Sequence, residues 1–487
     1  MKRILGYADR FSVRNVEQIE FMVSSPFEDN LDVSFVRIIH GDLNPAGPGY
    51  SEELLETHAA GTYPSHLQHL HPGSCVVVRD SAALSRLDSI HVQATIWPTL
   101  PNRGEQALVS KWSDDHGGFM VMIDETGALA LRLGDGTDVT TVSTRTALDS
   151  RVWYRVDAWF DAATGTAAVQ QSRLTDFPLT SVLARGEERV IVNPRFNNTA
   201  PLSIGACIAD ADRPIVRLAY DGKIDAPRLL RSPLSANDSL ALAAATSHQL
   251  SATHLASPIA SFIADIVGAW DFSDGIETTR VRDRSQNRHD GETHNMPTRA
   301  VKGYNWNGDE MNWRQAPEQY AAIHFHHDDL YDASWQPTFA LEVPKDWRSG
   351  FYAARIKCGT QEEYIPFFVV PRQGRATSRL AFLVPTASYM AYANEHLLMS
   401  GESAHALGRL AVFDERDVFT NEHREVGLSL YDYHADGSGV CYSSRLRPIV
   451  NMRPKYQFAG GLMGSNLHQY NGDTHIVNWL EAMDYDY

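Results

Sequence analysis

Alternating apolar and polar residues mark residues 81–235 as β-structure. In IHVQATIWP, residues 90–98, apolar side chains fall at every second position, as on a strand with one buried face. VWYRVDAWFD, residues 152–161, repeats this alternation. FMVMIDETGALALRL, residues 119–133, reads as two strands joined by a turn at 125–127, which is a hairpin signal. Short strands at regular spacing predict a β-sandwich over this region.

The order QALVSKWS, GGFMVMIDETGALALRLGDG, VWYRVDAWFD is similar to that of the laminin-G/concanavalin-like jelly roll, which implies this architecture for residues 81–295. PTFALEVP, SGFYAARIKCG and EYIPFFVVP, between residues 337 and 371, are strand-like and resemble a small immunoglobulin-like sandwich. Residues 1–80 contain further strand-like runs. We expect those N-terminal strands to join the immunoglobulin-like sandwich, with the jelly roll inserted between its two parts.

Helical patterns are short and lie mostly towards the end of the chain. SANDSLALAAATSHQL, residues 235–250, predicts one helix with Ser235 or Asn237 as N-cap. SRLAFLVPTASYMAYANEHL, residues 378–397, predicts a buried strand, a turn and a helix-like run. THIVNWLEAMDYDY predicts a final helix with one apolar face, formed by Ile476, Val477, Leu480 and Met483.

Strand, turn and helix in this order indicate the start of an α/β layer of the Rossmann or glutamine-amidotransferase-like kind. Such a layer needs at least one further strand after the last helix, so we expect an incomplete α/β domain. The predicted fold is therefore multidomain α+β, with a mostly β N-terminal part. The predicted domains are residues 1–80, 81–295, 296–373 and 374–487.

Composition narrows the class of protein. The chain has 487 residues and a net charge of -17, which disfavours binding to nucleic acids and to anionic membranes. The four cysteines are far apart and show no zinc or disulfide spacing. The N-terminus shows no secretion signal and no stretch is long enough to span a membrane. These features predict a cytoplasmic protein.

Several clusters of polar residues are candidate sites, although each has a plainer structural interpretation. HLQHLH, residues 66–71, and HFHHDD, residues 324–329, place histidines at alternating positions, where their imidazoles could share a metal ion. The plainer interpretation is that these histidines are solvated or hydrogen-bonded. Cys441 and His434 suggest a thiol nucleophile with a base, but buried inert cysteines are commoner. DGSG, residues 436–439, is a possible anion cradle or a simple turn. Arg445, Arg447 and Arg453 are candidates for binding the carboxylate of a ligand. The plainer interpretation is that they form ion pairs with neighbouring acidic residues.

Two pairs of tyrosines follow apolar runs in the predicted α/β layer. Tyr389 and Tyr392 come after FLV, and Tyr431 and Tyr433 come after LSL. Because strand ends in one α/β layer face the same crevice, these phenols are candidates for a shared site. A phenolate is a hard oxygen donor, and such donors favour a hard, highly charged metal ion.

Five segments together resemble the large subunit of N,N-dimethylformamidase. They are GYADRFSVR, RIIHGDLNPAGPG, HFHHDDLYDASW, FLVPTASYMAYANE and YHADGSGVCYSSRLRPIVNMRPKY. The resemblance covers essentially the whole chain. It implies a hydrolase that converts a small N-substituted formamide to formate and an amine. It also implies a mononuclear iron, as Fe³⁺, held by two tyrosines and a glutamate, and a hetero-oligomer with a small subunit.

Residue by residue, the resemblance identifies Tyr392, in AYANE, and Tyr433, in YDYHADG, as the iron tyrosines. They lie 41 residues apart, as the family pattern requires. Tyr389 and Tyr431 are the runners-up. The glutamate ligand and a histidine belong to a His-Pro-Glu type segment beyond Tyr487. We therefore expect an N-terminal portion of the enzyme, a chain completed by a second polypeptide, or one without activity.

The expected mechanism is attack of an iron-activated water on the formyl carbon. The departing amine needs a proton from a general acid, for which His434 is a candidate beside residues of the expected further segment. Asn394 is a candidate for hydrogen bonding to substrate or to a ligand phenol. The rival function is a non-catalytic protein that binds carbohydrate or protein through its jelly roll. A purely structural jelly roll that builds subunit contacts is a third possibility.

Overall fold

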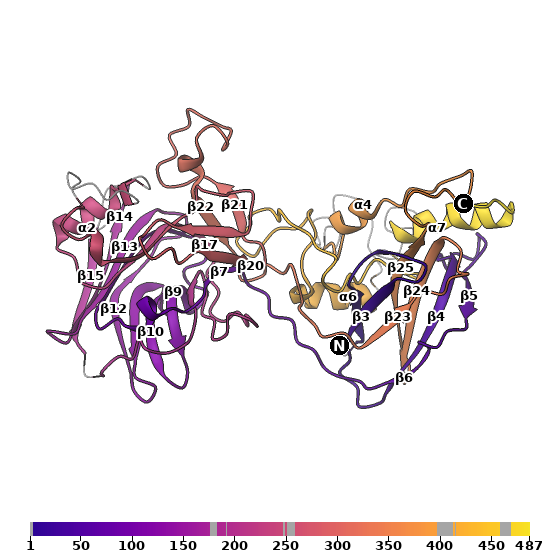
Figure 1. The fold of residues 1–487 in the computed structure, drawn as a ribbon, viewed down its shortest axis with the longest axis horizontal. Helices are drawn as coiled ribbons and strands as arrows, with labels where there is room; N and C mark the ends of the chain where they lie inside the picture. The colour runs from indigo at the N-terminus through magenta and orange to yellow at the C-terminus, as the bar shows by residue number, and fades with distance from the viewer. Residues whose placement is uncertain are drawn as a thin grey trace. The chain divides into compact units, whose positions relative to one another are not determined.

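A computed structural model describes residues 3–175, 183–190, 192–246, 249–250, 259–396, 413, 415–457 and 469–487. It contains two compact units (Figure 1). The first unit combines residues 1–71 with residues 330–487, and the second comprises residues 72–329. These limits differ from the predicted domain boundaries at residues 80, 295 and 373. The end of a compact unit depends on which distant strands pair with one another, and the periodicity of the sequence does not reveal this pairing.

The first unit contains two β-sheets that share one core. The six-stranded sheet consists of β2 (Ser12–Arg14), β25 (Gln361–Val370), β24 (Gly350–Cys358), β4 (Leu31–His40), β5 (Ser51–Leu55) and β6 (Gly61–Tyr63). The smaller sheet consists of β1 (Leu5–Ala8), β3 (Gln18–Ser24) and β23 (Phe339–Glu342). Phe35 of β4 lies opposite Ala354 of β24, so strands more than 300 residues apart in sequence are direct neighbours.

Aromatic rings join the two sheets of this unit. The ring of Phe21 contacts Phe35 and Phe367 of the large sheet and stacks on Phe339 of its own sheet. All four side chains are buried, and each contributes roughly 1.5–3 kcal/mol of transfer free energy. The three strands predicted between residues 337 and 371 are present as β23, β24 and β25.

The second unit consists of sixteen strands in one continuous ladder within its described residues. They are β7 (Cys75–Val78), β8 (Ile90–Pro98), β9 (Gln106–Ser113), β10 (Gly117–Ile123), β11 (Ala128–Gly134), β12 (Val139–Ala147), β13 (Tyr154–Asp161), β14 (Thr166–Arg173), β15 (Leu183–Arg189), β16 (Leu202–Ile204), β17 (Gly222–Leu230), β18 (Ile266–Asp271), β19 (Arg280–Asp283), β20 (Gly291–His294), β21 (Thr298–Val301) and β22 (Ala322–Phe325). β12 and β15 are the two ends of the main strand path, and they lie close together. This is shown by Gly186 of β15, where an added Cβ would overlap the carbonyl oxygen of Ser143 in β12. The ladder therefore nearly closes into a barrel.

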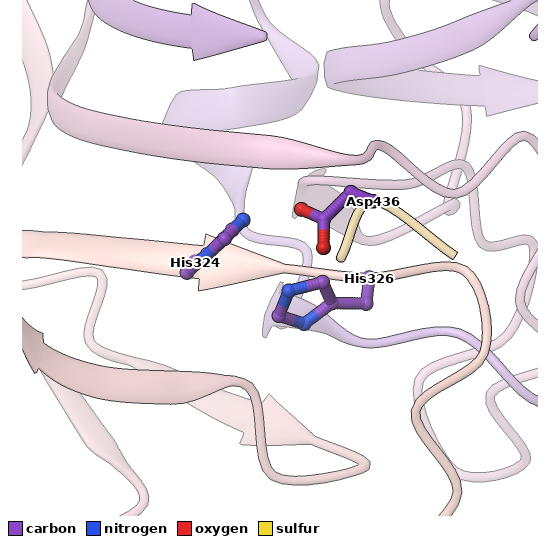
Figure 2. A group of neighbouring side chains, drawn as sticks. All are labelled: His324, His326 and Asp436. Atoms are coloured by element: carbon purple, nitrogen blue, oxygen red, sulfur yellow. The ribbon is translucent and has the colours of Figure 1, made fainter. Parts of the chain in front are cut away.

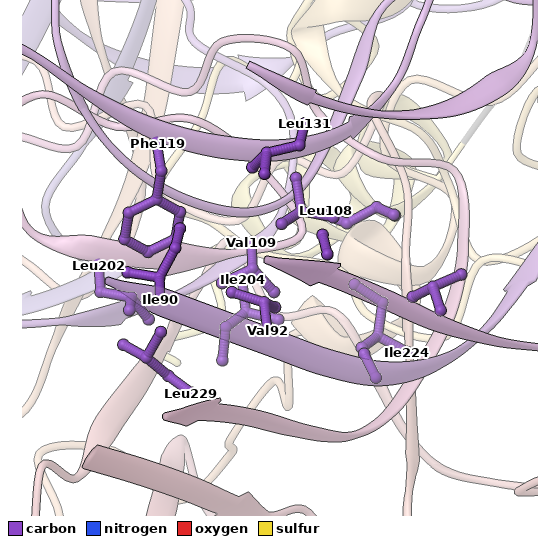
Figure 3. Packing of buried hydrophobic residues seen from close by; sticks show 14 of the residues in the cluster. Ile90, Val92, Leu108, Val109, Phe119, Leu131, Leu202, Ile204, Ile224 and Leu229 are labelled. Atoms are coloured by element: carbon purple, nitrogen blue, oxygen red, sulfur yellow. The ribbon is translucent and has the colours of Figure 1, made fainter. Parts of the chain in front are cut away.

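The interior of this unit is filled by the apolar positions that the alternation predicted. Ile90 and Val92 of β8 pack with Leu108 of β9, Phe119 of β10 and Leu131 of β11 (Figure 3). The predicted hairpin is confirmed, since β10 and β11 pair directly.

Helices are few in the described parts of both units. α2 (Ala236–Ala243) confirms the predicted helix, and its cap is Ser235, whose hydroxyl accepts from the N–H of Asp238. The remaining α-helices are α1 (Ala82–Ser85), α4 (Thr386–Ala391), α6 (Glu415–Glu422) and α7 (Tyr470–Ala482). The 3₁₀ turns are η1 (Ile263–Asp265), η2 (Pro317–Tyr320) and η3 (Arg424–Val426). No helix in the described part of the chain is long and apolar enough to cross a membrane.

The expected α/β layer is not present in the described residues from 374 onward, which contain helices and loops but no strand. The predicted strand at 379–384 is wrong, because no described segment pairs with its backbone. Phe382 instead stacks on Phe351 of β24 at 5.8 Å between ring centroids.

α7 confirms the predicted final helix but not its buried face. Val477 and Leu480 are buried, whereas Ile476 and Met483 are 45% and 55% exposed. The true buried face begins at Tyr470, one turn before the segment that carried the apolar pattern. It packs in one cluster with apolar residues of β4 and β24.

Candidate functional site

The predicted tyrosines lie in the first unit, at the end of α4 and in the loop of residues 427–434. Two backbone contacts join these segments. The N–H of Leu430 donates to the carbonyl of Ala391 at 2.9 Å, and the N–H of His396 donates to the carboxylate of Asp432 at 3.0 Å. The loop is therefore fixed against the α4 terminus, which ends with Tyr392 as its C-cap.

Tyr392 stacks on Tyr431. Their ring centroids are 4.3 Å apart and their planes differ by 22°. A side-chain hydrogen bond to Tyr431 raises the pKa of Tyr392 above its ordinary value, and burial adds to this effect. The structure thus pairs Tyr392 with the residue that the sequence ranked as a runner-up.

Tyr433 lies two residues further along the same loop, and its side chain is 64% exposed. Its backbone is fixed, because Arg424 donates to its carbonyl at 2.8 Å and it forms a bridge with Gly439. Within the described residues, its hydroxyl has no hydrogen-bond partner. The phenol is thus presented to solvent from a fixed backbone, where it is free to bind a ligand.

Tyr389, the other runner-up, is a packing residue. It is buried, and its hydroxyl hydrogen-bonds the carboxylate of Asp473 in α7. Burial, followed by this bond, raises its pKa far above the ordinary value. A phenol held in this way stays protonated, so Tyr389 does not suit a role as a metal ligand.

Two carboxyl groups accompany these tyrosines, and the sequence analysis did not identify them. Glu395 is buried, and burial, with a smaller contribution from Asp432, raises its pKa to about 8. Burial also acts on Asp432, but hydrogen bonds from His396 and from the N–H of Ser429 outweigh it and lower the Asp432 pKa. The available signal was the position of Glu395, three residues after Tyr392.

These donors fit iron in their chemistry. Phenol oxygens at Tyr392 and Tyr433, with the Glu395 carboxyl near the first of them, are hard oxygen ligands of the kind that a ferric ion prefers. The hydrogen bond that the Tyr392 hydroxyl donates to Tyr431 stabilises the protonated form of Tyr392, so a bound metal has to displace that proton.

Asn394 has a structural role. It is fully buried with φ at 60°, and its amide donates to the carbonyls of Val426 at 3.1 Å and Pro448 at 2.9 Å. Its side-chain oxygen accepts from the N–H of Val450 at 2.7 Å. Both ends of the amide therefore bind backbone, and Asn394 holds three loops together.

The segment after Tyr433 forms a closed turn. His434 is buried, and its N–H donates to the carbonyl of Ser438 at 2.8 Å. The N–H of Ser438 donates to the Asp436 carboxylate at 2.8 Å. The N–H of Gly437 donates to the carbonyl of His434 at 2.9 Å, so two of the N–H groups that an anion cradle at 436–439 would need are used within the turn. Cys441 is exposed, and its thiol lies 3.6 Å from the carbonyl of Gly439.

The histidines of HFHHDD lie in the second unit, at the end of β22 and just after it. The rings of His324 and His326 are 4.1 Å apart between centroids (Figure 2). The Nδ1 atom of His326 lies 3.3 Å from the Asp329 carboxylate, and that of His327 lies 2.9 Å from Asp221. The hydrogen-bonded interpretation therefore holds for His326 and His327.

Comparison with known proteins finds similar sequences. Residues 298–487 match the family described as N,N-dimethylformamidase beta subunit-like, C-terminal. The N,N-dimethylformamidase beta subunit of Paracoccus aminophilus is 38% identical over 100% of this chain, and that of an Alcaligenes species is 34% identical over 99%. The chain is a relative of the N,N-dimethylformamidase beta subunits. It spans 64% of the length of each of these two relatives.

Solved structures give only a weak likeness. The heptameric SAP-like pentraxin of Limulus polyphemus is 13% identical and covers 44% of this chain and 82% of its own, with a TM-score of 0.26. A TM-score this low supports no statement about fold or function. The informative likeness is therefore the sequence similarity to the two beta subunits.

Proposed function

We propose that this chain belongs to an amidohydrolase that converts a small N-substituted formamide to formate and an amine. Its relatives carry the name N,N-dimethylformamidase beta subunit along its whole length. The observation that carries the proposal is the joining of two segments, the α4 terminus and the loop at 427–434, through Leu430 and Ala391. This contact joins the segments that carry Tyr392 and Tyr433, which supports a shared role for the two tyrosines.

In this proposal Tyr392 and Tyr433 hold a mononuclear ferric ion. The family resemblance assigns a third ligand, a glutamate, to a segment outside residues 1–487. When bound, the ion would supply Lewis-acid activation of the formyl carbonyl and of water. Tyr431 orients the Tyr392 ring by stacking on it. His434, which follows Tyr433 directly in the loop, is the proposed proton donor to the departing amine.

The proposed assembly has further parts. Because both relatives are named as beta subunits, we propose that this chain also works in a hetero-oligomer with a smaller subunit. A further polypeptide segment would supply the glutamate. The substrate is a small amide whose N-substituents need only an apolar pocket.

Iron analysis with visible spectroscopy tests the ligand assignment. The ferric ion is added to the chain together with the polypeptide that completes the length of its relatives. A phenolate-to-iron absorption band is expected, and Tyr433→Phe should weaken or abolish it. Tyr485→Phe removes an exposed phenol of the same unit and should leave the band unchanged. Full iron content and an unaltered band in the Tyr433 variant would overturn the assignment.

Formate release tests the activity itself. The completed protein should release formate from dimethylformamide, and loss of the iron band should accompany loss of formate release. If the completed protein binds iron but hydrolyses no small formamide, the metal site would stand and the proposed reaction would be wrong.

A further inference from the structure

A cavity in the second unit lies beside β17. Its volume is about 740 Å³, and the centre of a water molecule can move through about 200 Å³ of it. Pockets that bind small molecules usually have volumes of about 300–1,000 Å³. The walls include the rings of Trp270, Phe272 and Tyr304 and the polar side chains of Ser273 and Asn305. The cavity therefore offers apolar surface and hydrogen-bonding groups within one space.

A β-bulge in β17 presents two charged groups to this cavity. From Asp225 to Arg228, β17 advances by three residues, whereas its partner β8 advances by two, from Thr95 to Gln93. The extra residue turns both charged side chains to the same face of the sheet, although a regular strand would place them on opposite faces. Both are buried, and both line the cavity. Ala226, inside the bulge, has φ at 47°, and such strain is commonly kept where it positions functional groups.

Arg228 keeps one donor for a ligand. Its Nη1 atom donates to the carbonyl of Leu242 at 2.6 Å and to the amide oxygen of Gln93 at 3.1 Å. Its Nη2 atom donates to the carbonyl of Ala245 at 3.1 Å. Its Nε atom bonds none of the described residues, and it is not among the atoms that the protein seals from solvent. The guanidinium is therefore fixed in place while its Nε atom can still reach a molecule in the cavity.

The charges that line the cavity nearly cancel. Asp271 is paired with Arg284, whose Nε atom donates to its carboxylate at 3.1 Å. Burial raises the pKa of Asp225 to about 7, so this carboxyl is protonated in about half of the molecules at neutral pH. Glu318 is exposed, where solvent screens its charge. A negative ligand would meet the carboxyl groups and a positive one would meet Arg228, so the lining favours a neutral ligand that both donates and accepts hydrogen bonds.

Tyr304 gives the cavity an accessible aromatic ring. Its side chain is 41% exposed, and its ring lies edge-on to Trp153 with 6.5 Å between the centroids. Burial and then Asp225 raise the pKa of its hydroxyl, while Arg228 lowers it, so the phenol lies near both charged groups. The ring can pack against an apolar face of a ligand while the hydroxyl bonds one of its polar groups.

We propose that this cavity binds a neutral monosaccharide. A sugar ring has an apolar C–H face, which suits the ring of Tyr304. Its hydroxyls both donate and accept hydrogen bonds, which suits the Asp225 carboxyl and the Nε atom of Arg228. The proposal concerns the second unit alone and requires neither the iron nor the hydrolysis, so it stands or falls separately from them.

Saturation-transfer NMR and calorimetry on the 487-residue chain test the binding, with glucose, galactose and mannose as probes. At least one of these sugars should bind. Its uronic acid and amino sugar analogues carry a charge on the same ring and should bind at least about tenfold more weakly. Tyr304→Ala removes the accessible ring and should weaken sugar binding about tenfold or more. Trp313→Ala removes an aromatic side chain of the same unit that does not line the cavity, and it should bind as the wild type does.

Asp225→Asn is a second variant that keeps the shape of the side chain and removes its charge. It should weaken sugar binding about threefold or more, because an amide oxygen accepts a weaker hydrogen bond than a carboxylate does. Three results would overturn the proposal. They are the absence of binding of all three sugars, binding of a charged analogue as tight as that of its neutral parent, and unchanged sugar affinity in Tyr304→Ala or in Asp225→Asn.

Discussion

Tyr392 and Tyr431 stack face to face, with ring centroids 4.3 Å apart, across two segments that are 39 residues apart in sequence. The hydrogen bond between their side chains is the largest cause of the raised pKa of Tyr392. Tyr431 thus controls how readily Tyr392 loses its proton. Proton loss is the step that a phenol must complete before it binds a metal.

Tyr431→Phe should lower the pKa of Tyr392 towards the ordinary value of about 10. The substitution keeps the stacked ring and deletes only the hydroxyl that raises the pKa. NMR titration of tyrosine labelled with ¹³C at Cζ, in the metal-free chain, measures this change. Tyr485→Phe, at an exposed position on the same unit, should leave the Tyr392 titration unaltered. A Tyr392 pKa that does not move in Tyr431→Phe would show that the hydroxyl is not its cause.

Asn394→Ala should destabilise the first unit by about 3–5 kcal/mol. The substitution leaves buried backbone groups of three loops unsatisfied and forces alanine into the left-handed region at φ 60°. Asn394→Gly relieves the backbone strain but not the lost hydrogen bonds, so its cost should be smaller. Urea unfolding measures both, with the exposed Asn307→Ala as a control expected within about 0.5 kcal/mol of wild type. Normal stability with lost activity would return Asn394 to a catalytic role.

Much of the β-structure could be predicted because each strand carries its own alternation. β8, β10, β11 and β13 bury the positions that the pattern marks. The helix α2 was also readable, since its cap lies next to it in sequence. Failures occur where the deciding partner is remote. The segment at 379–384 has the composition of a strand, but no described strand pairs with it.

The site was predictable only in part, for the same physical reason. The sequence identified Tyr392 and the loop around Tyr433, because tyrosines after apolar runs are visible locally. The stack on Tyr431 and the burial of Glu395 depend on a contact between Leu430 and Ala391, which no periodicity encodes. Asparagine is common at catalytic sites, so the sequence alone favoured a role for Asn394 in binding. Its side-chain amide bonds four backbone groups, and only the structure reveals these bonds.

Asp225 in β17 should make the stability of the second unit depend on pH. Burial raises its pKa to about 7; Arg228 opposes this shift and Asp271 adds to it. In the unfolded chain the carboxyl has a pKa of about 3.9. Between pH 4 and 7, roughly, the folded state binds the proton more tightly, so the free energy of unfolding falls as pH rises. Above about pH 7 this loss is complete.

Asp225→Asn should remove that dependence. The difference in unfolding free energy between variant and wild type should move in favour of the variant from pH 4 to pH 8, by on the order of a few kcal/mol. Urea unfolding at several pH values measures the difference. Asp115→Asn, at an exposed turn, is the control and should show a constant difference. A constant difference for Asp225→Asn as well would contradict the raised pKa.

Gly427→Ala should lower the stability of the first unit. Gly427 has φ at 94°, and a Cβ there would overlap the guanidinium of Arg447. Because Arg447 is buried and cannot swing into solvent, the whole side chain has to shift. We expect a loss of about 2 kcal/mol or more in unfolding free energy, which urea unfolding measures.

Gly439→Ala is the matched control for this substitution. Gly439 lies twelve residues further along the chain, and a Cβ there meets nothing within 4 Å. Its variant should therefore match the wild type in urea unfolding. If Gly427→Ala keeps wild-type stability as well, the tight packing of Gly427 against Arg447 is disproved.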